Sequence, residues 1–146
     1  MEIINRDEVI DQLEAVLFNC PQIDCPLVHR FTPGMYIREI FMPAGTMLTS
    51  MIHKTEHPYV VSKGKVNVEI NGVIENIEAP FFGITKPGTR RVLYILEDTV
   101  WTTFHALPMV TGEEKDKDLL VSKIIDLIIE PHDNKYLSED IKKQLK

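Results

Sequence analysis

Residues 43–64 read PAGTMLTSMIHKTEHPYVVSKG, and this stretch decides how the chain folds. Two apolar runs flank a polar segment that carries His53 and His57. Read literally, the segment matches H-x-x-E-H, the inverted zinc-peptidase motif, which works only when both histidines lie on one helical face. Pro58 follows at once, and a proline disfavours helix at the residue before it. The segment therefore indicates strand, turn and strand, and it argues against that peptidase class.

Strand signals continue on both sides of this stretch. Asn71-Gly72 separates two alternating runs, and this dipeptide is the strongest short-range signal for a hairpin with a type I′ turn. Lys63-Gly64 and Glu97-Asp98 are expected to break strands. Short strands at regular spacing indicate a sandwich or a barrel. The expected strands are 35–42, 46–53, 59–62, 65–70, 73–78, 81–85, 91–95 and 99–106.

Helical patterns lie at both ends of the chain. Asn5 is suited to cap a first helix, in which Val9, Leu13, Val16 and Leu17 follow helical spacing. Residues 116–130 predict a second helix, and residues 138–145 a short third one that Ser138 caps. We therefore expect one domain with three parts. These are an N-terminal helix and connector (1–28), a strand-rich body (29–108) and a C-terminal helical extension (109–146).

Composition excludes several classes of protein. Of 146 residues, 44% are hydrophobic and 26% charged, which is the usual globular mixture. The net charge of −6 argues against a dedicated nucleic-acid-binding domain. No apolar run approaches the roughly 20 residues that span a bilayer, and the acidic N-terminus does not resemble a signal peptide. Cys20 and Cys25 are expected to be reduced thiols. Together these features predict a cytoplasmic protein that binds neither membrane nor nucleic acid.

Between residues 45 and 64, the spacing of five residues resembles the first motif of the cupin superfamily. That motif is Gly, five residues, His-x-His, three or four residues, Glu, six residues and Gly. Here the corresponding positions hold Gly45, Met51, His53, His57 and Gly64. The second motif, Pro-x-Gly-x-x-His, has its counterpart in residues 86–91, KPGTRR. The resemblance covers roughly residues 30–106.

Within the superfamily, four segments look similar to small single-domain cupin-like proteins encoded by bacteriophages. The segments are HRFTPGMYIREIFMPAGT, IHKTEHPYVVSKG, KPGTRRVLY and EDTVWTTFH. The resemblance implies a mainly β protein built on one cupin-type barrel, that is, a double-stranded β-helix or jelly roll (RmlC-like). An N-terminal helix and a C-terminal helical extension would flank it. For a phage-encoded protein, the compartment would be the host cytoplasm.

The resemblance transfers metal-ligand roles only in part. His53 stands at the second His position, whereas Met51 replaces the first His and His57 the Glu. Arg91 replaces the His of the second motif, and a guanidinium cannot bind a metal because it stays protonated. His105 can complete a three-His set with His53 and His57. It shares one strand face, by the period of two, with Thr99, Trp101 and Thr103.

Three histidines with open coordination positions would suit one divalent ion of Fe, Zn or Mn. The alternative is that the three rings are partly buried and satisfied by hydrogen bonds.

Arg91 has two interpretations as well. With its basic neighbours Arg90, Lys86 and Arg38, it can orient a carboxylate or a phosphate. It can instead pair inside the protein with Glu39, Glu56, Glu97 or Asp98. Met51, Tyr59 and Trp101 would then line a ligand pocket beside it.

Two functional hypotheses remain open at this point. In the first, the barrel binds a divalent metal and a small anionic ligand. If it is an enzyme, the resemblance implies metal-assisted oxidation or isomerisation of a small molecule.

In the second hypothesis, the chain is a non-catalytic phage accessory or assembly protein. Residues 119–129 favour that role, because they are more apolar than one buried helix face requires. A homodimer or higher homo-oligomer would cover the surplus. The sequence names no catalytic residue.

Overall fold

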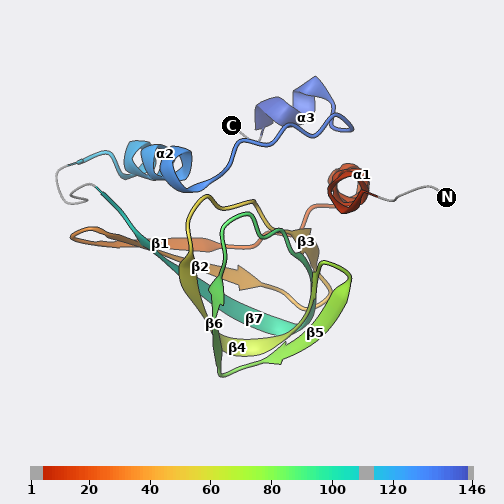
Figure 1. Cartoon of the computed structure of the whole chain (residues 1–146), viewed down its shortest axis with the longest axis horizontal. Coiled ribbons are helices and arrows are strands. Elements are labelled where there is room, and N and C mark those ends of the chain that lie inside the picture. The colour runs from red at the N-terminus through yellow and green to blue at the C-terminus, as the bar shows by residue number, and fades with distance from the viewer. Residues whose placement is uncertain (1–4, 109–113, 145–146) are drawn as a thin grey trace.

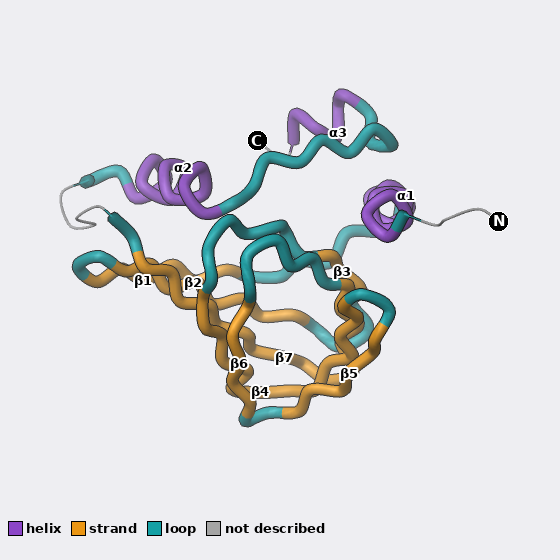
Figure 2. Tube along the Cα trace, viewed as in Figure 1, coloured by secondary structure: helices purple, strands orange, loops and turns teal. Residues whose placement is uncertain are grey.

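A computed structural model describes residues 5–108 and 114–144 of the chain (Figure 1). Seven strands close into a barrel, and the helices all lie on one side of it, above the loops at one end (Figures 1 and 2). The elements are α1 (Arg6–Phe18), β1 (Leu27–Thr32), β2 (Met35–Met42), β3 (Met47–Thr49), β4 (His57–Ile70), β5 (Val73–Glu78), β6 (Phe81–Thr85), β7 (Val92–Ala106), α2 (Lys117–Ile128) and α3 (Glu139–Gln144).

All strand pairs are antiparallel, and the two longest strands, β4 and β7, lie side by side in the middle of the sheet. The order is β1-β2-β7-β4-β5, with β3 paired to β7 and β6 paired to β4. The prediction that Lys63-Gly64 and Glu97-Asp98 end strands was wrong, because both lie inside β4 and β7. At Gly64 the backbone takes φ +100°, and the β4–β7 register shifts around it. The irregularity bends the long strands around the barrel without ending them.

Several elements match their predicted bounds. Residues 35–42, 73–78 and 81–85 are strands as expected, and Asn71 and Gly72 both take positive φ (51° and 85°) in the hairpin turn. The expected strand at 46–53 is confined to β3, and β1 begins at Leu27, inside the stretch predicted as connector. The predicted division at residue 109 lies outside the described residues.

The predicted inward face of β7 is confirmed. Thr99, Trp101 and His105 are 0%, 7% and 1% exposed. They face Met42, Ile40 and Tyr36 of β2 in register. The rest of the barrel core is apolar and consists of Tyr59, Val61, Val66, Val68, Ile77, Leu93 and Ile95.

Helix α1 forms as predicted, but the face that it buries against the rest of the protein is not the predicted one. The side chain of Asn5 accepts hydrogen bonds from the backbone N–H groups of Asp7 and Glu8, as an N-cap should. However, Val9 and Val16 are exposed, whereas Ile10 and Asp11 are buried. The reason lies across the interface, where buried Arg90 forms ion pairs with Asp11 and Glu14. Charge pairing, rather than the valine positions, therefore sets which face of α1 meets the barrel.

Helix α2 packs one face on the barrel. Leu120, Ile124 and Ile128 are buried against Tyr36, and Phe31, Leu107 and Ile129 pack around them. Asp116 caps the helix, which begins at Lys117, one residue after the predicted start. No helix among the described residues has the length and apolar character needed to cross a membrane.

Gly64 should be far less replaceable than another glycine of the same backbone type. A Cβ at Gly64 would lie 2.3 Å from Thr99 Oγ1 and 2.5 Å from the carbonyl oxygen of Asp98, whereas one at Gly45 (φ +86°) would meet nothing within 4 Å. We expect Gly45→Ala to cost about 1–2 kcal/mol from its positive φ, and Gly64→Ala to reach ~4 kcal/mol or more because β7 must also shift. Urea unfolding measures both, and equal losses would contradict the steric argument.

Candidate metal centre

Three imidazoles converge at the end of the barrel nearest the helices. His53 lies in the connection between β3 and β4, His57 is the first residue of β4, and His105 lies near the end of β7. One nitrogen of each ring lies within 4.8 Å of the others. The ring centroids of His57 are 4.4 Å from His53 and 4.5 Å from His105. The convergence predicted for His53, His57 and His105 is thus present in the structure.

Strand pairing brings two of these rings together. Tyr59 of β4 pairs with Thr103 of β7. His57 lies two residues before Tyr59 on β4, and His105 lies two residues after Thr103 on β7. Because the strands are antiparallel and side chains alternate, both histidines lie next to this pair on the same inward face. Both are buried, with 3% and 1% of their surface exposed.

His53 is held by a different part of the chain, the segment that follows α2. The backbone N–H of Lys54 donates to the carbonyl of Ile128, and that of Glu130 to the carbonyl of Ile52, both at 2.7 Å. His53 itself forms a β-bridge with Ile129. On its other side, the N–H of Gly88 donates to the His53 carbonyl at 2.9 Å. Two segments distant in sequence therefore fix the backbone that presents this ring.

Hydrogen bonding leaves ring nitrogens available for a metal. His57 Nδ1 lies 3.1 Å from the Thr55 carbonyl. Since a carbonyl only accepts, Nδ1 carries the proton and Nε2 has a bare lone pair. His105 Nε2 lies 2.8 Å from Thr103 Oγ1, while its Nδ1 is buried without a partner. When Nε2–H donates to this hydroxyl, the Nδ1 lone pair is free. Three neutral imidazoles with backbone or side-chain support fit a divalent ion.

The electrostatics keep these rings neutral. Burial, assisted by the charges of His57 and Arg38, lowers the pKa of His53 to about 4. Burial and the charges of His57 and His53 lower the pKa of His105 to about 3. Burial also lowers the pKa of His57, against the opposing effect of its bond to the Thr55 carbonyl. Neutral imidazole is the form that binds metal, so no proton has to be displaced at neutral pH.

Two arginines border the triad. Arg91 is 8% exposed, and its Nε is buried without a hydrogen-bond partner. Its guanidinium lies over the Tyr59 ring, 5.2 Å from the centroid. Arg38 of β2 pairs in register with Thr103, the residue bonded to His105. Among the described residues neither arginine forms an ion pair, so the internal pairing considered for Arg91 is absent.

The remaining residues singled out from the sequence lie in different places. Tyr59 and Trp101 are buried and stacked at 4.6 Å, beside Arg91. Met51 is 56% exposed and does not join the three rings, although it stands at a motif position. Lys86 pairs with Glu56 at 2.5 Å on the surface. His53 and His57 lie on no helix, in agreement with the argument against a peptidase motif.

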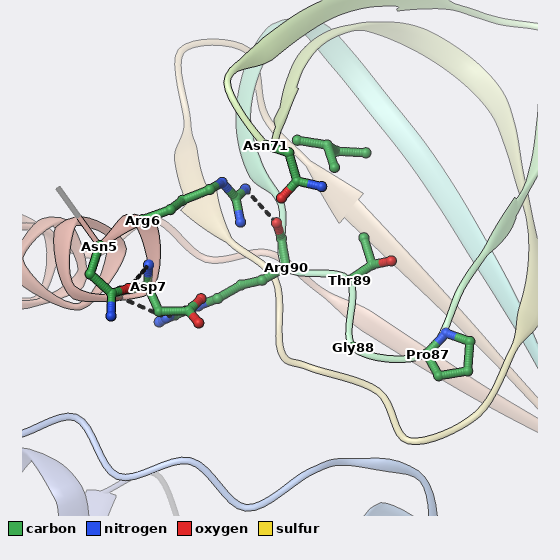
Figure 3. Close-up of a pocket in the computed structure, with 9 residues that line it drawn as sticks. Asn5, Arg6, Asp7, Asn71, Pro87, Gly88, Thr89 and Arg90 are labelled. Atoms are coloured by element: carbon green, nitrogen blue, oxygen red, sulfur yellow. Dashed lines mark hydrogen bonds and ion pairs between the residues drawn. The ribbon is translucent and has the colours of Figure 1, made fainter. Parts of the chain in front are cut away.

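Arg90 turns away from the triad. It belongs to the loop before β7 and reaches α1, where it forms ion pairs with Asp7, Asp11 and Glu14. Figure 3 shows Arg90 beside Asp7. The hollow drawn in Figure 3, of about 310 Å³, lies between the start of α1, the Asn71 turn and this loop, and no histidine lines it. The sequence offered no signal for this contact, because Arg90 lies 76 to 83 positions from its partners in α1.

The barrel is a double-stranded β-helix, mainly β, with an N-terminal helix and C-terminal helices. Solved structures of the cupin superfamily share this fold. A cupin superfamily protein from Desulfitobacterium hafniense aligns with a TM-score of 0.50 and 6% identity, over 64% of this chain and 86% of its own. An uncharacterised conserved protein with a double-stranded β-helix domain from Klebsiella pneumoniae aligns with a TM-score of 0.51 and 16% identity, over 63% and 85%. No family model matches the sequence, and no curated protein matches it.

Buried neutral histidines predict a specific loss of stability in acid. The unfolded chain binds protons at these rings below pH ~6.5, whereas folded His53 and His105 resist until pH is about 4 and about 3. The unfolded state therefore binds more protons in this window. The free energy of unfolding should fall as pH drops, by about 1.4 kcal/mol per pH unit for each histidine.

Urea unfolding of metal-free protein between pH 7 and pH 5 tests this. His105→Gln should flatten the pH dependence by one proton, even if it lowers stability at pH 7. An unchanged slope would show that His105 is protonated in the folded state.

Proposed function

We propose that this protein binds one divalent transition-metal ion through His53, His57 and His105. The observation that carries the proposal is the buried, unpartnered Nδ1 of His105, on a ring that has one nitrogen within 4.8 Å of ligand nitrogens of His53 and His57. A buried polar atom without a partner is rare and calls for a ligand. Three hydrogen-bonded histidines would require that atom to be satisfied within the protein, and it is not.

The donor set limits the ion. Three imidazoles, with no thiolate or carboxylate joining them in the part of the chain that the structure describes, suit Fe(II), Zn or Mn and leave coordination positions open for water or a small ligand. Arg91, with Tyr59 and Trp101 beside it, supports an anionic ligand at such a position. Met51 would reach this ligand only after a change in its exposed loop.

Metal content decides the proposal. Protein purified without chelator and dialysed against Zn²⁺, Fe²⁺ or Mn²⁺ should retain one ion per chain by elemental analysis. His53→Ala and His105→Gln should lower the metal affinity at least ~100-fold, because each removes one of three ligands. His132→Gln is the control, since His132 binds Asp11 of α1 and lies outside the triad.

The circular dichroism spectrum of each variant should show that the barrel has folded. A wild-type protein that folds and retains no ion from any of the three solutions would refute the proposal. Equal retention by the wild type and His105→Gln would likewise move the ion away from this site.

A second candidate function, assembly with another copy of this chain, rests on α2. Leu119, Ile125 and Leu127 are 45%, 39% and 43% exposed, although α2 already buries three residues on the barrel. The surplus of apolar residues anticipated at 119–129 is therefore present. Ile128, however, belongs to the buried face and is not available to a partner.

Sedimentation measurements test this second candidate. A dimer through α2 should dissociate on Leu127→Asp, because a charge would be buried at the interface. Val16→Asp, on the exposed side of α1, should leave the dimer intact. A monomeric wild type at high protein concentration would rule out this use of α2.

A further inference from the structure

Arg38 occupies an unusual position for a charged residue. Along β2 it alternates with Tyr36 and Met42 on the inward face of the barrel, and both of these are buried. Its neighbours across the sheet are His29 of β1 and Thr103 of β7. Two residues away, Tyr36 pairs with His105 and stacks on its ring at 5.7 Å. The guanidinium of Arg38 therefore belongs to the same region as the three imidazoles.

The arginines of this chain fall into two groups. Arg6, Arg30 and Arg90 form ion pairs with carboxylates at the surface or under α1. Arg38 and Arg91 form no ion pair with any residue in 5–108 or 114–144. They are the two arginines whose side chains turn into the barrel. A guanidinium stays charged in proteins, so it cannot relieve this situation by losing its proton. A desolvated charge without a counter-ion is costly, and proteins normally supply a partner.

The charge of both arginines is felt at the triad. Arg38 lowers the pKa of His53 and His105, and Arg91 that of His53 and His57, in each case after the larger effect of burial. The described carboxylates contribute nothing of opposite sign to these three rings. Among the described carboxylates, Glu75 acts on Arg91 through its charge, whereas none acts on Arg38. A divalent ion bound there would add further positive charge beside the two guanidiniums.

We propose that Arg38 and Arg91 together hold a small oxyanion against the metal of the three-His centre, and that Arg38 determines the preference for an anion. This inference rests on the proposed metal site. The ligand is a carboxylate or a compound with an equivalent oxyanion, because a guanidinium fork matches the paired oxygens of that class. One oxygen would meet the open metal position and another the guanidinium of Arg38.

The proposal makes metal and anion binding mutually dependent. An anion screens the metal from two guanidiniums, so each ligand raises the affinity for the other by the same factor. The same charges imply an unusual effect of mutation. Arg38→Met removes a positive charge near the metal, and should therefore tighten metal binding in the absence of an anion.

Titration with Co²⁺, whose visible spectrum reports imidazole coordination, measures both effects. In the wild type, acetate or sulfate should tighten Co²⁺ binding about tenfold or more, equivalent to ~1.4 kcal/mol. In Arg38→Met, Co²⁺ should bind more tightly than in the wild type without anion, and the anion should add little. Arg30→Met is the matched control, since Arg30 is exposed on β1 and pairs with Glu39.

The outcomes separate the two proposals. Co²⁺ binding that is intact but indifferent to both anions, or equally anion-dependent in Arg38→Met, would overturn the anion site and leave the metal site standing. Failure of the wild type to bind Co²⁺ would overturn the metal site. The anion site is then read from metal-free protein, in which acetate or sulfate should raise the Tm of the wild type and of Arg30→Met more than that of Arg38→Met. Equal rises would overturn it.

Discussion

The antiparallel pairing of β4 with β7 is the constraint on which the rest of the structure depends. Both strands are long, and they pair over most of their length. Their register therefore determines which side chains face the barrel interior from one end to the other. At one end it stacks Val66, Val68 and Ile95 into an apolar core. At the other it places Tyr59 against Thr103, and hence His57 beside His105. A slip of one residue in either strand would turn the histidine and the core side chains of that strand outward, so the apolar end fixes the geometry of the polar end.

Much of this arrangement is legible in the sequence, for local reasons. Asn71-Gly72 fixes a hairpin because both residues accept positive φ, and the period of two places Thr99, Trp101 and His105 on one face. The spacing of His53 and His57 around a bend indicated that their rings converge. The predicted strand end at Lys63-Gly64 was wrong because the glycine conformation that ends a strand at a turn can also bend a strand within a barrel.

What the sequence could not supply depends on contacts between distant segments. The backbone of His53 forms a β-bridge with Ile129 and accepts a hydrogen bond from the N–H of Gly88, and no local pattern relates these residues. Arg90 and Arg91 are adjacent and chemically alike, yet one pairs with acids of α1 while the other turns onto Tyr59. Alternation along the chain predicts that their side chains point apart, but not which of them meets carboxylates. That choice is made by the docking of α1.

The resemblance to the cupin motifs gives this difference a chemical meaning. The usual set of three histidines and one glutamate brings one negative charge to the metal, which partly neutralises a divalent ion. Here His57 replaces the acid, Arg91 replaces a histidine, and Arg38 lies beside the triad without a carboxylate among the described residues. A divalent ion bound by the three histidines would thus be surrounded by neutral ligands and fixed cations. In a partly buried site such an excess of positive charge would be poorly screened by water, so a bound metal would need its missing negative charge from a ligand. On this argument, if the triad holds a metal, the exchange of ligands would change the site from one that tolerates neutral ligands to one that requires anions.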